Sequence, residues 1–89
     1  MTNNHNLELV LELLETVEKA KEAIINQNRF MARPLIESLE KRVLTIKSVH
    51  PQSHVLYKIV ALLHKDVLTN LYTNLEAMEA QKWSPLKSF

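Results

Sequence analysis

The fold of this protein is decided by a dense apolar stretch, Val55-Leu56-Tyr57-Lys58-Ile59-Val60-Ala61-Leu62-Leu63. It belongs to a longer run, residues 53–83, that contains neither glycine nor proline. Successive side chains of a helix are about 100° apart, so the apolar residues of this stretch cover well over half of the helix circumference. A helix that is apolar almost all round has to be covered almost all round. The sequence therefore predicts a central helix over about residues 53–82, against which the other helices pack.

The apolar face of this central helix changes direction along the chain. In the second half the face narrows to one side and is turned by roughly a quarter turn from the face of the first half. The residues of this second face are Leu68, Leu71, Leu75 and Met78. We expect a kink, a curve or a switch from intramolecular to intermolecular packing where the face changes, near Lys65 and Asp66.

Two amphipathic segments precede the central helix and supply its neighbours. The first is predicted over about residues 7–26, with Asn6 as its N-cap. The second is predicted over about residues 34–48, because proline suits the first position of a helix and Pro34 opens this segment. The second segment has one narrow apolar stripe, which indicates a peripheral helix with one buried face.

The turns between these helices contain residues that we expect to cover the junctions or to cap the helices. Phe30 and Met31 are expected to cover the first junction. Pro51 ends the second helix, and Ser48 or Ser53 is available to cap the third.

The last residues, 83–89, form a C-terminal tail, and Pro85 within it prevents the central helix from continuing. Trp83, Leu86 and Phe89 place three large apolar side chains in this short segment. Because an exposed apolar tail is a liability for a soluble protein, folding back onto the bundle is favoured over docking on another chain.

Together these segments predict an all-α fold, a single antiparallel helical-bundle domain over residues 1–89. Its three main helices are expected at about 7–26, 34–48 and 53–82, and a fourth short helix or packing of the tail 83–89 is left open. The absence of glycine disfavours strand-rich folds and phosphate-binding loops. The absence of cysteine excludes a disulfide framework, a thiolate nucleophile and a cysteine-based zinc site.

The sequence has no signal-peptide pattern at its N-terminus and no apolar run of about eighteen residues, so we expect a soluble cytoplasmic protein without a transmembrane segment. Its charge is unevenly distributed. Residues 1–28 carry five glutamates against two lysines, whereas residues 29–65 carry seven lysines and arginines against two glutamates. Attraction between helices, within the bundle or across a dimer, explains this pattern better than a polyanionic partner does.

Histidine is the one obvious chemical resource of the sequence. His50 and His54 are four residues apart, but Pro51 between them predicts a turn in place of a shared helical face, and no carboxylate completes a metal site. The segment from His54 to Lys58 loosely resembles a histidine phosphotransfer domain, yet bulky residues follow the histidine where that family has small ones. An all-helical mutase of the chorismate type would fit the size, but its arginine-bearing first helix has no counterpart here. We therefore predict no catalytic residue, no metal and no cofactor, and a protein that is not an enzyme.

Protein binding is the function that the pattern favours. Small, glycine-poor helical proteins without cysteine are common among bacterial adaptors, secretion chaperones, anti-factors and immunity proteins. Immunity proteins against small antimicrobial peptides resemble this chain in size, antiparallel bundle and C-terminal tail. We expect an adaptor, inhibitor or immunity-type module that binds a protein partner or itself stoichiometrically, as a dimer. The alternative is a weak nucleic-acid-binding or regulatory dimer that uses the basic region 29–65; nucleic acid is disfavoured because Glu37 and Glu40 share its exposed surface.

Two surfaces are predicted to bind the partner, because aromatic and arginine anchors dominate interface energies. One is the tail, with Trp83, Leu86 and Phe89. The other is a basic ridge of His54, Lys58 and Lys65, beside Arg33 and Arg42.

Overall fold

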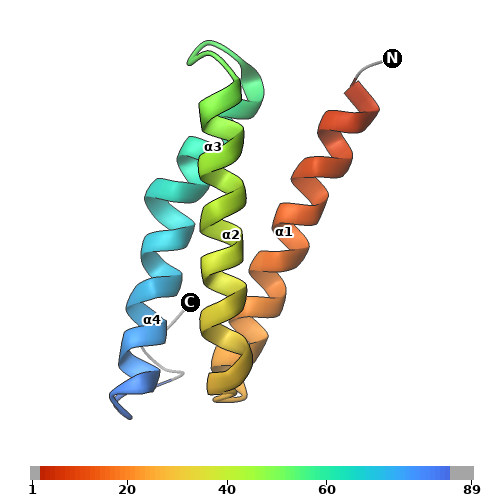
Figure 1. Ribbon diagram of the computed structural model, residues 1–89. Coiled ribbons are helices and arrows are strands. Elements are labelled where there is room, and N and C mark those ends of the chain that lie inside the picture. The colour runs from red at the N-terminus through yellow and green to blue at the C-terminus, as the bar shows by residue number, and fades with distance from the viewer. Residues whose placement is uncertain (1–2, 85–89) are drawn as a thin grey trace.

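The computed structural model describes residues 3–84, and the side chains of residues 5–84. Within this range the chain forms three antiparallel helices joined by short turns (Figure 1). The third helix is built from three consecutive pieces, α3, the π-helical η1 and α4. The elements are α1 (Asn3–Ile25), α2 (Arg29–Val49), α3 (Val55–Leu62), η1 (Leu63–Leu68) and α4 (Thr69–Glu79). The predicted all-α bundle of three main helices is therefore confirmed.

The turn after α1 and the end of α4 use the same C-terminal motif. Gln27 and Gln81 have positive φ, 53° and 59°. After α1 the amide of Asn28 donates to the carbonyl of Ala23, and after α4 the amide of Lys82 donates to that of Ala77. These bonds define the Schellman motif, whose left-handed residue is usually glycine. A chain without glycine places glutamine there instead.

The second helix begins earlier than predicted. Its N-cap is Asn28, whose side-chain oxygen accepts a hydrogen bond from the amide of Met31 at 3.3 Å. Pro34 therefore lies inside the helix and does not open it; the cap outweighs the preference of proline for the first position. Phe30 is 92% exposed and Met31 is half exposed, so the expectation that they cover the junction was wrong.

The predicted caps of the other two helices were also wrong. α1 begins at Asn3, so Asn6 lies within it. α3 is capped by His54, whose Nδ1 accepts a hydrogen bond from the amide of Leu56 at 3.0 Å. Ser48 instead donates to a carbonyl of its own helix. An imidazole nitrogen two residues before the donor amide thus caps the helix as a serine hydroxyl was expected to do.

The irregularity expected near Lys65 and Asp66 is the π-helical segment η1. A π segment holds one residue more than the α-helical segment it replaces. In a regular α-helix that extra residue would turn the side chains that follow by about 100°. Taking it up in the π segment compensates the quarter-turn drift of the apolar face in the sequence. As a result Leu56 and Val60, before the segment, and Leu71 and Leu75, after it, are all buried in the same core.

α2 is the central element of the bundle, and this corrects the prediction. α2 contacts α1, α3, η1 and α4, whereas α1 and α3 hardly touch. Its stripe of Ala32, Ile36, Leu39, Val43 and Ile46 is buried. At its start, the predicted central helix is buried on one side and exposed on the other, where Val55 and Leu62 are largely exposed.

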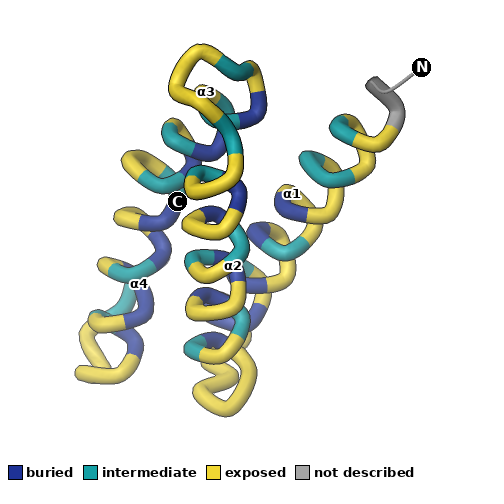
Figure 2. Tube along the Cα trace, turned by 45° about the horizontal axis from the view of Figure 1, so that its top comes forward, coloured by how far each residue is buried: buried dark blue, intermediate teal, exposed yellow. Residues whose placement is uncertain are grey.

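The core is one continuous cluster that runs the length of an elongated molecule, 45 × 21 × 20 Å. Figure 2 shows that α1 diverges from the other helices toward its N-terminus. Its first buried residue is Leu13. No helix in the described part of the chain is long and apolar enough to span a membrane.

Candidate interaction surface

Apolar side chains are exposed on two segments that diverge at one end of the bundle. These are the N-terminal half of α1 and the start of the third helix, and Figure 1 shows both at the end of the bundle that carries the turn between α2 and α3. Five large apolar residues on these segments are between 44% and 62% exposed. We call these residues the open face: Leu7, Leu11 and Leu14 of α1, and Val55 and Leu62 of the third helix.

An ion pair shows how the α1 half of the open face is oriented. Arg42 of α2 donates from Nη2 to Oε2 of Glu12 at 2.8 Å, so the side of α1 that carries Glu12 faces α2. The three leucines of the open face lie about 100–160° around the helix from Glu12. They therefore lie away from the side of α1 that faces α2.

Contacts of Lys47 orient the α3 half in the same way. Its Nζ lies 3.4 Å from Nδ1 of His64 and 5.7 Å from the centre of the Tyr57 ring. These contacts place the Tyr57 side of α3 against α2. Val55 and Leu62 lie about 140–160° around the helix from Tyr57, away from the side that faces α2.

Two predicted partner-binding residues, Lys58 and Lys65, lie beside the open face. Both are exposed. They share a shallow hollow on α3 with Leu62, Tyr57 and Ala61. A cationic edge thus runs along the outer side of the apolar stripe on the third helix.

His54 has a structural role in the described part of the chain. Besides capping α3, its ring stacks on His50 with 4.4 Å between ring centroids. His64 lies next to Lys47, through the contact between its Nδ1 and the Lys47 Nζ. No group of three or more histidine, aspartate or glutamate side chains among the described residues is arranged to hold a metal ion.

Arg33 and Arg42 do not join Lys58 and Lys65 in one ridge. Arg33 forms a two-point ion pair with Glu79 of α4, through Nη2 at 2.7 Å and Nε at 3.0 Å. The hydrogen bond from Arg33 lowers the pKa of Glu79 below its ordinary value. Arg42 holds α2 to α1. Both arginines are engaged in joining helices, and their role in partner binding stays a prediction.

Tyr72 makes a second polar contact between α4 and α2. Its hydroxyl donates to Oε1 of Glu40 at 2.7 Å. Burial and the neighbouring carboxylate of Glu40 raise the pKa of Tyr72 to about 12. A phenol that keeps its proton this firmly serves as a hydrogen-bond donor between helices.

Of the predicted tail residues, Trp83 folds back onto the bundle. Its indole Nε1 donates to Oδ1 of Asn74 at 2.9 Å, and the half-buried ring packs against the core. Asn74 is the buried polar residue of the core. Leu86 and Phe89 lie outside the described residues. Trp83 lies at the end of the molecule opposite the open face, beside Gln27 and Arg29.

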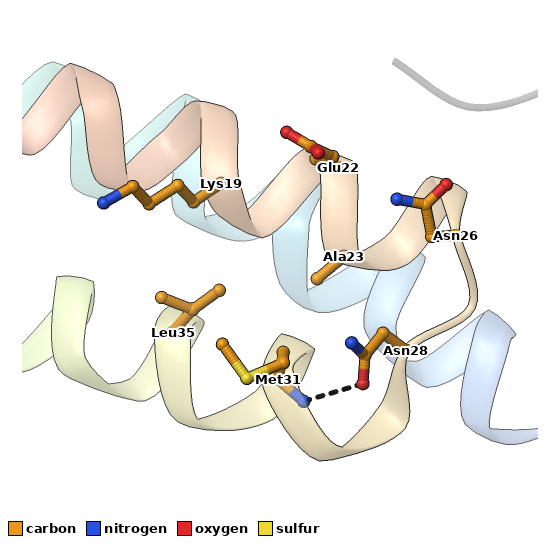
Figure 3. A pocket seen from close by; sticks show the side chains of 7 residues that line it. All are labelled: Lys19, Glu22, Ala23, Asn26, Asn28, Met31 and Leu35. Atoms are coloured by element: carbon orange, nitrogen blue, oxygen red, sulfur yellow. Dashed lines mark hydrogen bonds between the residues drawn. The ribbon is translucent and has the colours of Figure 1, made fainter.

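A cavity of about 220 Å³ lies between the end of α1 and the start of α2 (Figure 3). Its walls are Ala23, Met31 and Leu35, and its rim carries Lys19, Glu22, Asn26 and Asn28. The figure shows the rim side chains spread apart along the two helices. The hydrogen-bonding group nearest its floor, the side-chain oxygen of Asn28, is already occupied by the amide of Met31. The cavity therefore brings no set of polar groups together on a ligand.

The sequence contains a signal for the open face that prediction did not use. Leu7, Leu11 and Leu14 are spaced four and three residues apart, as in the seam of a coiled coil. In the sequence they merge with the core residues of α1 into one broad apolar face. The structure separates the two sets, since Leu13 and Val17 are buried whereas Leu11 and Leu14 are almost half exposed.

Comparison of this chain with protein-family models, with curated proteins and with solved structures finds no match.

Proposed function

We propose that this protein is a small helical interaction module that acts by stoichiometric protein binding rather than by catalysis. The observation that carries the proposal is the open face, where five large apolar side chains are 44–62% exposed at one end of the bundle. Exposed apolar residues that gather in one place, rimmed by charges, are typical of protein-binding surfaces.

The energy available at this face is appropriate for association. Burying the exposed half of a leucine side chain contributes roughly 1 kcal/mol. Five such residues contribute roughly 5 kcal/mol, while association costs about 4–15 kcal/mol of lost freedom. A partner must therefore bury these residues together with a comparable apolar surface of its own.

The classes that fit this mode of action are adaptors, inhibitors and immunity-type proteins. Bacterial proteins of this size and composition are common in each of these classes. A cytoplasmic location fits the sequence, because a protein without cysteine has no need of an oxidising compartment.

Weak nucleic-acid binding by the basic region 29–65 is the alternative that we favour less. Arg33 and Arg42, two of its seven cations, are paired with glutamates. A salt titration separates the two classes, because contacts with phosphate make affinity fall steeply with ionic strength.

Site-specific photo-crosslinking in the producing cells tests the proposed function. A benzophenone side chain in place of Leu11 should give a single crosslinked protein species of fixed stoichiometry. The partner in this species can be a different protein or a second copy of the chain. Leu44 is the matched control, since it is also a leucine of similar exposure, 46% against 49%, on a different face. The proposal fails if Leu11 gives no crosslinked protein, or if Leu44 gives the same products.

A further inference from the structure

We propose that the end of the bundle opposite the open face docks on an anionic lipid surface. This end carries the turn between α1 and α2 and the end of α4 (Figure 1). Large apolar side chains are exposed there, since Ile25 is 54% exposed, Phe30 92% and Met31 50%. We call these three residues the apolar tip. The inference goes beyond the proposed function, because it assigns a second surface to a different kind of partner.

The residues of the apolar tip share one level along the bundle axis. Ile25 is the last residue of α1, and Phe30 and Met31 are the second and third residues of α2. Because a helix rises about 1.5 Å per residue, all three lie within one helical turn of this end of the molecule. A plane laid across the end therefore reaches the three side chains at once.

The same residues point to different sides of the bundle. Phe30 lies about 160° around α2 from the buried Ala32. Met31, by contrast, lines the cavity between α1 and α2 together with Leu35. A groove on a folded protein takes side chains from one face of a helix. A lipid surface accepts side chains that share a level but not a face, so the arrangement favours lipid over a protein partner at this end.

The turn between Ile25 and Phe30 suits the headgroup layer of a lipid surface. Its residues Asn26, Gln27 and Asn28 are polar and uncharged. Their backbone amides all donate to carbonyls in the last turn of α1. Contact with lipid therefore leaves no backbone amide of these three residues without a partner.

Cations surround the apolar tip. Arg29 is exposed at the first position of α2, and Lys82 is exposed just beyond α4. Residues 19–33 carry four cations against one carboxylate, and residues 76–82 carry one cation against two carboxylates, which leaves a net charge of +2. Lysine and arginine near an anionic lipid surface are attracted to it. The charge of this end thus complements an anionic surface.

The two features reinforce each other. A shallow apolar anchor binds a membrane weakly and reversibly, and a cationic patch beside it adds a second attraction. Burying the side chain of Phe30 corresponds to roughly a tenfold to hundredfold change in the partition coefficient. Each cation near the surface corresponds to roughly a fivefold change. Reversible binding that depends on both features is therefore expected.

Vesicle binding tests the proposal, and Trp83 is a reporter already present. It is the one tryptophan of the chain, and it lies at this end beside Gln27 and Arg29. The full-length protein should bind vesicles of mixed phosphatidylglycerol and phosphatidylcholine, and brominated lipid in them should quench the fluorescence of Trp83. Vesicles of phosphatidylcholine alone should bind at least tenfold more weakly, since the cations then lose their attraction.

A substitution at each end of α2 locates the apolar contact. Phe30→Ser should lower the partition coefficient at least tenfold. Val49→Ser is the matched control, because Val49 is 66% exposed at the opposite end of α2. It should leave the partition coefficient unchanged. Circular dichroism establishes that both variants keep their helices.

Charge reversal locates the electrostatic contact. Arg29→Glu with Lys82→Glu should abolish the preference for anionic vesicles. Lys58→Glu with Lys65→Glu reverses two exposed lysines on the third helix and should leave that preference intact. An equal loss in the two double variants would show that net charge, and not this end of the bundle, attracts the vesicles, and would overturn the proposal.

Two further outcomes would overturn it. One is wild-type protein that does not bind anionic vesicles, or that binds them equally well with Phe30→Ser. The other is a benzophenone at position 30 that is crosslinked in cells to a protein and not to lipid. Neither outcome involves Leu11, so the crosslinking test of the open face is decided separately.

Discussion

Gln27 and Gln81 are the two residues with positive φ among those that the structure describes, and each sits at the end of a helix. A left-handed conformation costs a residue with a Cβ roughly 1–2 kcal/mol, whereas glycine adopts it freely but loses more entropy on folding. We predict that Gln27→Gly and Gln81→Gly each raise the free energy of unfolding by about 0.5–1 kcal/mol. Urea denaturation followed by circular dichroism measures the change.

Gln52 is the control for this prediction. It is an exposed glutamine in the turn between α2 and α3, and its φ is not positive. Gln52→Gly should therefore lower the free energy of unfolding slightly or leave it unchanged, since it only adds freedom to the unfolded chain. An equal gain at all three positions would show that the left-handed strain is not the cause.

The third helix is the element in which sequence and structure can be compared most directly. The drift of its apolar face was evident from helical periodicity, and so was its position near Lys65 and Asp66. The form of the irregularity was not, because a kink, a curve and a π segment all absorb the same drift. The structure has a π segment, in which one extra residue brings Leu68 and Leu75 back into line with Leu56.

This interpretation predicts that one residue can be removed from η1 at little cost. Deleting the exposed Asp66 converts the segment to a regular α-helix and keeps Leu71 and Leu75 directed at the core. We expect the variant to unfold cooperatively, with its free energy of unfolding changed by less than about 1.5 kcal/mol. Guanidinium denaturation and near-ultraviolet circular dichroism check this.

Deletion of Thr73 is the matched control, because this residue is also exposed but lies in the regular helix α4. Removing it turns Leu75 and Met78 by about 100° away from the core. Loss of these two buried side chains should cost about 3–6 kcal/mol. If both deletions were equally harmful, the extra residue would not reside in η1.

At the level of the elements, the number and order of the helices followed from apolar periodicity, whereas their centre did not. The sequence favours 53–82 as the central helix because it is the most apolar. Position in the bundle is decided instead by connectivity: α2 is the middle helix of an antiparallel row, so it contacts both neighbours. The start of α2 was misplaced because Pro34 was weighed above the cap at Asn28.

The two ends of the molecule differ in how well the apolar side chains of the core are covered. One end is closed by Trp83, which packs against the core and bonds to Asn74. The other is left open where α1 diverges from α3. Sequence reasoning predicted Lys58 and Lys65 as partner-binding residues, and these lysines lie beside the proposed surface, but it did not single out Leu7 and Leu11. Half-exposed and buried leucines belong to one broad apolar face of the first segment in the sequence, and the structure distinguishes them, since Leu13 is buried and Leu11 is half exposed.

This difference between the two ends predicts that folding stability and partner binding depend on different residues. Trp83→Ala removes the packing of a half-buried ring and leaves the buried oxygen of Asn74 without the indole donor. We expect the free energy of unfolding to fall by about 2–4 kcal/mol. Crosslinking from the benzophenone at position 11 should not change, because the open face lies at the other end. Phe30→Ala, at an aromatic residue that is 92% exposed, should change the free energy of unfolding by less than about 0.5 kcal/mol. A Trp83→Ala variant that keeps its helices but loses the crosslink at position 11 would place the binding surface at the tail and contradict the assignment of the open face.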